Sequence, residues 1–358
     1  MFCRKDNLFI IEMKGVIFLE RNITIAIDAM GGDNAPFEIV KGVVDAVNLY
    51  PVKVLLVGKE DVVKNELKAY KYDEDSIEVV NADEIIGTDE VPTEAVRKKK
   101  NSSVMVALNL VKEGKADSFL SAGSTGAIFV AGTVTVGRIK GVDRPAIATC
   151  IPTASGFFLL LDSGANVDCK PQYLEQFAKM GTVYAENVLG IKNPTVGLAN
   201  IGVEKEKGNM LVKEAYELLE KTEGINFVGN AEMVDIPKGV VDIVVCDGFV
   251  GNTIVKLFEG IGKTLLGVVK TEITKGAYKI AASTLKTPFN NIKKIFDSDE
   301  IGGAPYIGLK SLVMKVHGSC KAPAIKNAVG QAIEFIENDT VKKLEALIQG
   351  EKGETNNE

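Results

Sequence analysis

Five clusters of glycine, serine, asparagine and aspartate fall where apolar, strand-like runs give way to helical patterns. Glycines free the backbone to turn tightly and to approach a ligand, and the free N–H groups at a helix start attract anions such as phosphate. Because ligands of open α/β sheets sit at the carboxyl ends of the strands, the clusters predict one shared site for a polar ligand. A plain strand-to-helix turn is the alternative for any single cluster. The clusters are Asp28–Asp33, Ser121–Gly126, Asp162–Asn166, Asn200–Gly202 with Glu204–Asn209, and Asp247–Asn252.

Several side chains near these clusters can act on a phosphate or on a carbonyl group. Lys207 can place a cation beside phosphate or a developing oxyanion, or it can be one charge of a solvated run. Asn252 opens a helical pattern, so it is either a cap or an amide donor to a carbonyl oxygen. The hydroxyls of Ser124 and Thr125 suit phosphate or a capped helix start. His317 is the single histidine, and it is either a site residue or a packed side chain that satisfies a backbone group.

Other chemistries are disfavoured by what the sequence contains. One histidine removes most zinc sites, and any serine–histidine mechanism would have to run through it. No Gly-x-Gly-x-x-Gly is present, and Gly262-Lys263-Thr264 is not a phosphate loop because Leu257 stands where that loop needs glycine. Five cysteines without a Cys-x-x-Cys pair fit a reducing, cytoplasmic setting. The net charge of −6 argues against nucleic acid as a partner.

The elements that must position these residues alternate between strands and helices, which predicts a mainly parallel sheet covered by helices on both faces. No run of 18 apolar residues is present. We expect an arm outside the fold over residues 1–22, a single catalytic α/β domain over 23–350 and a disordered tail over 351–358. Strands are expected near 23–27, 52–57, 77–80, 118–120, 146–151, 157–161, 196–201, 225–228 and 241–245. Helices are expected near 37–49, 62–70, 104–112, 127–136, 173–188, 210–219 and 252–270, with Asn34 capping the first.

Two basic regions suggest partners. Arg97, Lys98, Lys99 and Lys100 form a run that can receive an acidic protein or an anionic ligand, or can simply be an exposed face. Residues 255–296 combine an apolar helical stripe with many lysines, which is typical of an element at a membrane surface. A helix pair buried at a subunit interface is the alternative, and the two can coexist. Leu265, Leu266 and Val269 are the candidate membrane contacts of this segment.

The chain closely resembles the bacterial phosphate acyltransferase family, whose members transfer acyl groups from acyl carrier protein to phosphate in phospholipid synthesis. The resemblance runs from about Ile23 to the last helix. Its motifs are Ile25-Ala-Ile-Asp-Ala-Met-Gly-Gly-Asp33, Arg97-Lys-Lys-Lys-Asn-Ser-Ser103, Ser121-Ala-Gly-Ser-Thr-Gly-Ala127, Arg144-Pro-Ala146, Leu161-Asp-Ser-Gly-Ala-Asn166, Lys207-Gly-Asn209, Asp247-Gly-Phe-Val-Gly-Asn252, Gly302-Gly-Ala304 and Lys315-Val-His-Gly-Ser319. Ser124 stands where asparagine is common in that family.

The resemblance implies a reaction in which phosphate attacks the thioester of an acyl group on acyl carrier protein, with no covalent enzyme intermediate, no cofactor and no metal. It also implies a three-layer α/β/α sandwich similar to phosphotransacetylase and the isocitrate dehydrogenase group, with a protruding amphipathic helix pair. The implied partners are the carrier protein at Arg97–Lys100, a second copy, the inner face of the cell membrane and a membrane glycerol-phosphate acyltransferase. Lys207 and Asn252 are the implied catalytic residues. The implied phosphate- or substrate-binding residues are Asp28, Gly31, Gly32, Ser121, Gly123, Ser124, Thr125, Gly126, Asn166, Asn209, Asp247, Gly251 and His317.

Two other functions remain open at this point. A metal- and nicotinamide-dependent dehydrogenase of the same fold group is one alternative, although the dinucleotide fingerprint is missing. A non-catalytic scaffold between the carrier protein and the membrane is the other.

Overall fold

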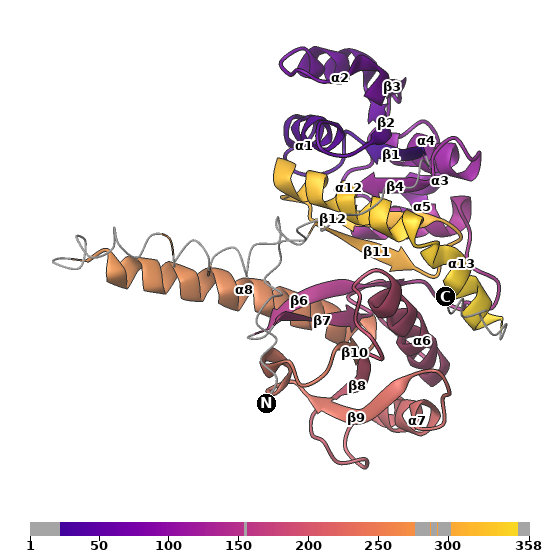
Figure 1. The fold of residues 1–358 in the computed structure, drawn as a ribbon, viewed down its shortest axis with the longest axis vertical. Helices are drawn as coiled ribbons and strands as arrows, with labels where there is room; N and C mark the ends of the chain where they lie inside the picture. The colour runs from indigo at the N-terminus through magenta and orange to yellow at the C-terminus, as the bar shows by residue number, and fades with distance from the viewer. Residues whose placement is uncertain (1–21, 154–155, 276–286, 288–291, 293–301, 350–358) are drawn as a thin grey trace, which may run out of the picture.

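The computed structural model describes residues 22–153, 156–275, 287, 292 and 302–349. Strands and helices alternate along the chain, and most neighbouring strands are parallel, as the alternation predicted (Figure 1). The strands divide between a seven-stranded sheet and a five-stranded sheet. Each sheet is covered by helices on both faces, which gives the expected three layers.

The seven-stranded sheet has the strand order β3-β2-β1-β4-β12-β11-β5. Ile25 and Ile27 of β1 face one core cluster with helices α1, α2 and α12, whereas Ala26 faces the opposite cluster with α3, α4 and α5. This alternation is what a strand buried on both sides requires. The strands are β1 (Ile23–Asp28), β2 (Val52–Gly58), β3 (Ile77–Asn81), β4 (Ser118–Ser121), β5 (Ala146–Ile147), β11 (Gly303–Ile307) and β12 (Leu312–Val316). The helices are α1 (Phe37–Val47), α2 (Glu60–Leu67), α3 (Pro92–Lys98), α4 (Ser103–Lys112), α5 (Thr125–Thr135) and α12 (Ala322–Glu337), with a short turn of helix η1 (Glu74–Ser76).

The five-stranded sheet has the order β6-β7-β10-β8-β9. Helices α6 and α7 cover one face, and the first turns of α8 cover the other through Val255 and Phe258. Only Ala148 separates β5 from β6, so the run expected as one strand at 146–151 belongs to both sheets. The elements are β6 (Thr149–Thr153), β7 (Gly156–Leu161), β8 (Thr195–Asn200), β9 (Asn226–Glu232), β10 (Ile243–Val245), α6 (Pro171–Asn187), α7 (Met210–Leu219), α8 (Gly248–Ile273), α13 (Thr340–Ile348) and η2 (Ile236–Lys238).

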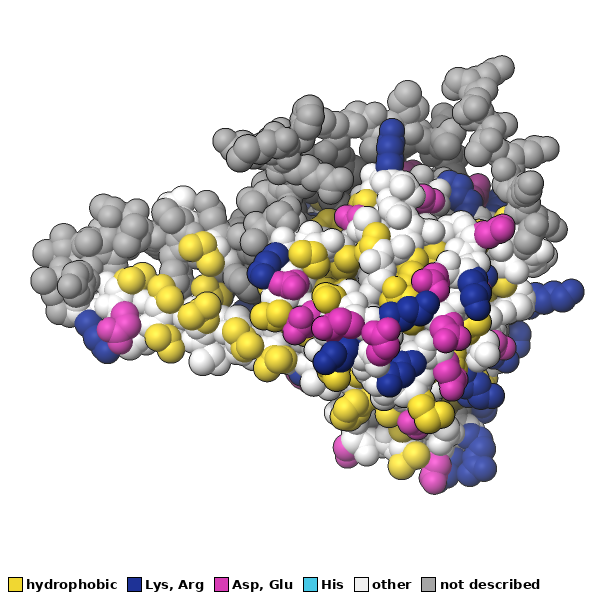
Figure 2. All heavy atoms as spheres, turned by 90° about the horizontal axis from the view of Figure 1, so that it is seen from below, with side chains coloured by type: hydrophobic (Ala, Val, Ile, Leu, Met, Phe, Trp, Pro, Cys, Tyr) yellow, Lys and Arg dark blue, Asp and Glu magenta, His cyan; other side chains and the backbone are white. Residues whose placement is uncertain are grey.

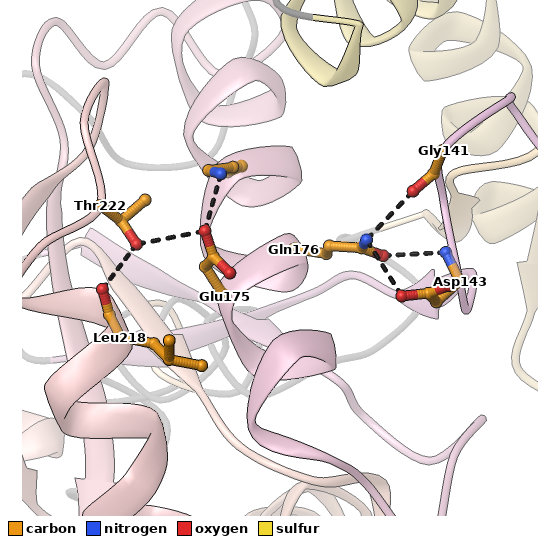
Figure 3. Close-up of polar contacts among 7 residues, drawn as sticks. Gly141, Asp143, Glu175, Gln176, Leu218 and Thr222 are labelled. Atoms are coloured by element: carbon orange, nitrogen blue, oxygen red, sulfur yellow. Dashed lines mark hydrogen bonds and ion pairs between the residues drawn. The ribbon is translucent and has the colours of Figure 1, made fainter.

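Helix α6 holds the segment before β5 and the end of α7 through two neighbouring side chains (Figure 3). Gln176 donates to the carbonyl of Gly141 at 3.0 Å and accepts from the backbone N–H of Asp143 at 2.9 Å. Glu175 accepts from the hydroxyl of Thr222 at 3.4 Å, beyond the end of α7. The polar side of α6 thus fixes the chain on its way into the strand that joins the two sheets.

Helix α8 begins inside the fold and then protrudes from it (Figure 1). Apolar side chains line the exposed surface of the protruding part (Figure 2), among them Leu257, Ile261, Leu265, Val268 and Val269, which are 39–58% exposed. Among the described residues, no helix has the length and apolar character needed to cross a membrane. Most of the second half of the expected 255–296 segment lies outside the described residues, as do nearly all of the expected arm and the tail.

Candidate active site

A cavity with a volume of about 440 Å³ opens between the two sheets. Its apolar wall includes Phe129, Ile147, Ile151, Val255 and Phe258. Its polar lining comes from the carboxyl ends of four strands or the helices that follow them: Thr125 after β4, Ser163 after β7, Asn252 after β10, and Lys315 and His317 at the end of β12. The site is therefore a gap between the carboxyl edges of two sheets, where sequence predicted one edge of one sheet.

The first cluster is held by a buried carboxylate. Asp28 is fully buried and accepts from Ser121 Oγ at 2.6 Å and from the backbone N–H of Met30 at 3.0 Å. Ser121 Oγ in turn accepts from the N–H of Gly123 at 2.9 Å. Burial raises the pKa of Asp28 above its usual range, and the hydrogen bonds from Ser103, Ser121, Met30 and Gly31 act against that rise. Asp28 and Ser121 therefore join two turns, and neither lines the cavity.

The glycines of this cluster serve close packing between turns. A β-carbon at Gly31 would lie 2.4 Å from Asp28 Oδ2 and 2.7 Å from the nitrogen of Gly123. Gly32 has φ +100°, and its β-carbon would lie 2.9 Å from the carbonyl oxygen of Gly318. We expected these glycines to let a ligand approach, and the structure shows that the close approach of neighbouring turns also requires them. Asn34 is not the cap of α1, because Pro36 holds the N-cap position without a side-chain cap, and the Asn34 amide instead donates to the carbonyls of Ser319 and Cys320 at 3.0 Å.

A second buried carboxylate organises the turn after β7. Asp162 accepts from the backbone N–H groups of Ile147, Ala165 and Asn166 at 2.9, 3.1 and 2.6 Å. The side-chain amide of Asn166 donates to Asp162 at 3.0 Å and to the carbonyl of Pro145 at 2.8 Å. Burial raises the pKa of Asp162, opposed by these bonds. The expected ligand residue Asn166 is buried, and both of these bonds use its amide to hold the turn.

Three more of the expected binding residues cap helices. Asp247 accepts from Val250 N–H at 2.9 Å at the start of α8, and Asn209 accepts from Val212 N–H at 3.0 Å at the start of α7. Ser124 accepts from Ala127 N–H at 3.5 Å at the start of α5, a long and weak bond. Cap side chains satisfy helix N–H groups that would otherwise have no partner. The capping alternative therefore describes all three in this structure.

Two glycines bring helix starts against neighbouring backbone and side chain. A β-carbon at Gly251 would lie 1.9 Å from the carbonyl oxygen of Asp162, so α8 begins directly against the turn after β7. A β-carbon at Gly126 would lie 2.9 Å from Pro92 Cγ, so the start of α3 rests on the start of α5. These contacts place Asn252 beside Gly164 in the cavity wall, since Gly164's own β-carbon would lie 3.3 Å from that of Asn252.

His317 lies in the cavity wall between β12 and α8. Its Nδ1 is 3.0 Å from Ser319 Oγ, and its Nε2 is 3.5 Å from Glu259 Oε1 on α8. The contact with His317 lowers the pKa of Glu259 below its usual range. Glu259 also lies 3.7 Å from Lys256 Nζ, so this carboxylate is shared between a histidine and a lysine.

Lys315 is the cavity residue that our sequence reasoning did not single out. Its Nζ donates to the carbonyl oxygen of Ala122 at 3.2 Å and to that of Val316. Burial lowers the pKa of Lys315 to about 8. The motif Lys315-Val-His-Gly-Ser319 draws attention through its histidine, although strand periodicity puts residues 315 and 317 on the same face.

Lys207 lies outside this cavity. It is exposed on the segment between β8 and α7. Strand β8 pairs with β10, whose end leads to Asn252, so Lys207 belongs to the next strand end along the same sheet edge. Gly202 and Lys207 are close, since a β-carbon on the glycine would lie 3.3 Å from Lys207 Cγ.

The basic run is less positive than its sequence suggests. Lys98 pairs with Glu94 at 2.8 Å, and Lys99 pairs with Glu90 at 2.6 Å while donating to the carbonyl of Ile85 at 2.7 Å. Arg97 and Lys100 are exposed and form no ion pair with the described residues. Two free cations thus remain at the end of α3, the helix that rests on the start of α5.

Two further groups bear on the chemistry. Cys150 lines the cavity, and burial raises the pKa of its thiol to about 12. Because the thiolate is the nucleophilic form, this cysteine is poorly suited to attack.

The hydroxyl of Ser163 is 2.6 Å from Thr149 Oγ1 and donates to the carbonyl of Ile147 at 3.1 Å. Over the described residues, no group of three or more histidine, cysteine and acidic side chains is placed to hold a metal ion.

Comparison with known proteins gives consistent relatives. Residues 23–343 match the family described as "Fatty acid synthesis protein". A phosphate acyltransferase from Clostridium acetobutylicum is 50% identical over 327 residues, covering 91% of this chain and 98% of that protein. A phosphate acyltransferase from Alkaliphilus oremlandii is 49% identical over 327 residues, covering 91% and 96%.

Solved structures show a shared fold at low identity. A phosphotransacetylase from Streptococcus pyogenes superposes with a TM-score of 0.59 at 15% identity, covering 90% of this chain and 95% of that one. One from Staphylococcus aureus superposes with a TM-score of 0.55 at 16% identity, covering 87% and 94%. The expected likeness to the phosphotransacetylase fold is confirmed.

Proposed function

This chain belongs to the phosphate acyltransferase family of fatty acid synthesis proteins and is an acyltransferase of lipid synthesis, and from that premise we propose that it transfers a fatty acyl group from acyl carrier protein to inorganic phosphate. A phosphate oxygen bonds to the thioester carbonyl carbon, and the carbon–sulfur bond then breaks. The carrier leaves as a thiolate, which takes a proton from water. The products are an acyl phosphate and the free carrier.

Direct attack by phosphate is the mechanism that this site favours. Phosphate is already a nucleophile, and a thiol of pKa about 8.5 leaves without much acid assistance. Cys150, the thiol in the cavity wall, has a pKa of about 12 and so is a poor candidate for a covalent acyl carrier. What the site must supply is position and charge balance, which amides, helix starts and lysines can provide.

Asn252 is the proposed donor to the carbonyl oxygen as negative charge develops there. Its side chain lines the cavity at the start of α8, against the turn that Asp162 holds rigid. The α5 start, with Thr125 and Gly126 in the cavity wall, offers N–H groups to an anion. Lys207, at the neighbouring strand end, is proposed to offset negative charge at the reacting group.

The observation that carries this proposal is the combination of surfaces in one cavity. Apolar side chains such as Phe129, Ile151 and Phe258 suit an acyl chain, while Asn252, Lys256 and Lys315 suit an anion and a carbonyl. Acyl carrier protein is the proposed donor, because α3, whose start rests on the start of α5 at the cavity wall, carries cations at its other end. Arg97 and Lys100, which form no ion pair within the described part of the chain, are the cations that an acidic carrier would meet.

Helix α8 is the proposed link to other partners. Its exposed stripe of Leu257, Ile261, Leu265, Val268 and Val269 suits a second copy of the chain and the surface of a membrane. We place the enzyme in the cytoplasm, at the inner face of the cell membrane, where a membrane glycerol-phosphate acyltransferase would take the acyl phosphate.

Phosphate-dependent release of carrier thiol tests this function. Purified protein is incubated with palmitoyl carrier protein, with and without inorganic phosphate, and the free thiol is measured. Release that requires both protein and phosphate is the expected result. Failure of release with carriers of every acyl length tried would refute the proposal, and binding of the carrier without turnover would favour the scaffold.

A further inference from the structure

Lys315 lies where the end of β12 meets the end of β4 and the start of α5, which are far from it in the sequence. It is the penultimate residue of β12, which lies between β4 and β11 in the seven-stranded sheet. Parallel pairing sets Lys315 opposite Ser121, at the end of β4. Its side chain lines the cavity together with Thr125 and Gly126 from the start of α5. A cationic side chain is thus fixed beside a helix start, inside the space where substrate is expected.

The ammonium of Lys315 donates to two backbone carbonyls and has one further hydrogen to donate. An ammonium has three hydrogens to donate. Two of them go to the carbonyl oxygens of Ala122 and Val316. Within the described part of the chain, no carboxylate forms an ion pair with this lysine, so one hydrogen remains to donate and the positive charge has no direct counterion.

The other charged groups of the cavity either have an ionic or hydrogen-bond partner or are exposed to water. Glu259 lies 3.5 Å from His317 and 3.7 Å from Lys256, which occupies that carboxylate with two partners. The Lys256 side chain is 61% exposed, so water hydrates its charge. Lys315 is mostly removed from water, and burial lowers its pKa to about 8. An anion placed in the cavity would relieve this cost most strongly at Lys315, because unscreened charges interact strongly.

We infer that Lys315 binds the attacking phosphate, with its free ammonium hydrogen on a phosphate oxygen and the start of α5 alongside. The inference rests on the proposed function and deepens it by assigning the phosphate to the part of the cavity lined by Lys315 and the start of α5. Lys315 keeps its proton throughout. It neutralises charge on the nucleophile and holds it in place while the phosphate oxygen bonds to the carbonyl carbon and the thiolate leaves.

Three substitutions separate charge from shape at this position. Lys315→Gln keeps a donor for the Ala122 carbonyl without the charge, Lys315→Met removes both, and Lys315→Arg keeps the charge. Lys310→Gln is the matched control, because Lys310 is an exposed lysine in the same hairpin outside this cavity. Steady-state kinetics are measured for phosphate and for palmitoyl carrier protein separately, and binding of inorganic phosphate alone is followed by calorimetry.

The neutral variants are expected to raise the KM and the dissociation constant for phosphate by about tenfold or more, since charge-assisted hydrogen bonds are the strong ones. The KM for the carrier should stay within about threefold, and arginine should restore phosphate binding to within about threefold. A phosphate KM unchanged in Lys315→Gln, or raised equally in Lys310→Gln, overturns the assignment. Wild-type protein that releases no thiol with phosphate refutes the proposed function instead, so the two failures are distinct.

A second measurement serves if the neutral variants do not fold. After burial, the charged groups that act on the pKa of Lys315 are Cys320, Asp33 and Asp28, which raise it, and Lys256, which lowers it. At about pH 8.5 phosphate is already a dianion, and Lys315 with its pKa of about 8 is largely neutral. Phosphate binding must then return a proton to the lysine, which calorimetry detects as proton uptake in buffers of different ionisation enthalpy. The titration is repeated between about pH 8.5 and 10.5, where phosphate stays a dianion. Uptake of up to one proton, absent in Lys315→Arg, supports the assignment, and zero uptake by the wild type over that whole range overturns it.

Discussion

The α-carbon of Gly251 faces the carbonyl oxygen of Asp162 so closely that a β-carbon at position 251 would lie 1.9 Å from that oxygen. The contact is backbone to backbone, so no side-chain rotation can relieve it. It joins the first turn of α8 to the turn after β7, and with it Asn252 to the wall of the cavity.

Gly251→Ala is therefore expected to destabilise the protein by about 1–3 kcal/mol or more and to lower kcat, because α8 must move outward. Gly260 and Gly267 lie on the same helix, and a β-carbon at either would meet no neighbouring atom of the described residues within 4 Å. Alanine at either should stabilise by about 0.5–1 kcal/mol, as expected in a helix interior. Thermal unfolding measures all three. Equal effects at 251 and 260 would contradict the packing role of Gly251.

Ser121→Ala tests the bond between the first two turns. The buried carboxylate of Asp28 would lose the donor at 2.6 Å, which we expect to lower the free energy of unfolding by about 1–3 kcal/mol. Ser124→Ala in the same turn removes only a bond of 3.5 Å and should cost less. Urea titration of both variants checks the order, and a larger loss at 124 would show that the Asp28–Ser121 bond is not what holds the turns.

Asn252→Ala tests the proposed donor to the thioester carbonyl. Loss of one such donor typically costs about 10²–10³ in kcat, with little change in folding stability expected here. Thr253→Ala is the neighbouring control, since the Thr253 hydroxyl bonds to the Phe249 carbonyl at 2.8 Å on the exposed side. Lys207→Ala should also lower kcat, because the positive charge that offsets the developing negative charge is lost. Near-normal turnover of Asn252→Ala would remove this side chain from the reacting site.

The pH dependence of phosphate use follows from Lys315. Its pKa is lowered from 10.5 to about 8, so the free enzyme loses this charge as pH rises through about 8. The kcat/KM for phosphate, which reports groups of the free enzyme, should fall above about pH 8 by up to tenfold per pH unit. In Lys315→Arg the fall attributable to this group should disappear, because arginine stays charged. An identical alkaline limb in wild type and Lys315→Arg would assign it to another group.

The apolar stripe of α8 predicts attachment to vesicles. Replacing Leu265, Leu266 and Val269 together by glutamate should reduce flotation with vesicles of anionic lipid several-fold, because the loss of apolar area and the added negative charge both oppose insertion. Val62→Glu on α2, a valine 42% exposed elsewhere on the surface, is the control. Light scattering of the same variants reports the oligomeric state. Undiminished flotation would reject the membrane role and leave a subunit interface as the use of the stripe.

The sequence predicted the alternating elements well because their patterns are local. It missed β11 and β12, and Gly303 and Pro305 interrupt the pattern of the first of these strands. Strand β12 then inserts beside β4, which brings Lys315 to the carbonyl of Ala122 across 193 positions of chain. The periodicity of β4 and of β12 does not indicate that the two strands pair.

The glycines show a second limit of pattern reasoning. A glycine that admits a ligand and a glycine that admits another part of the chain look alike in sequence. In the structure a β-carbon at Gly251 would meet the carbonyl oxygen of Asp162, and one at Gly31 would meet the Asp28 carboxylate and the nitrogen of Gly123. Likewise Asp162 and Asn166 carry polar groups that a binding site could use, but burial directs them to each other. Composition pointed to turns that border the cavity, whereas their internal hydrogen bonds decide which side chains face it.

Helix α8 is long, and its first turn is held tightly against the fold. At 1.5 Å per residue its 26 residues span about 39 Å, and Asn252 and Leu265 stand about 20 Å apart along it. Gly251 packs directly against the Asp162 carbonyl, so the start of α8 cannot shift relative to the turn after β7. A partner or surface that bound the outer end of α8 would therefore also set the orientation of the cavity. A hinge introduced between residues 252 and 265 is therefore expected to uncouple the orientation of the cavity from anything bound at the outer end of α8.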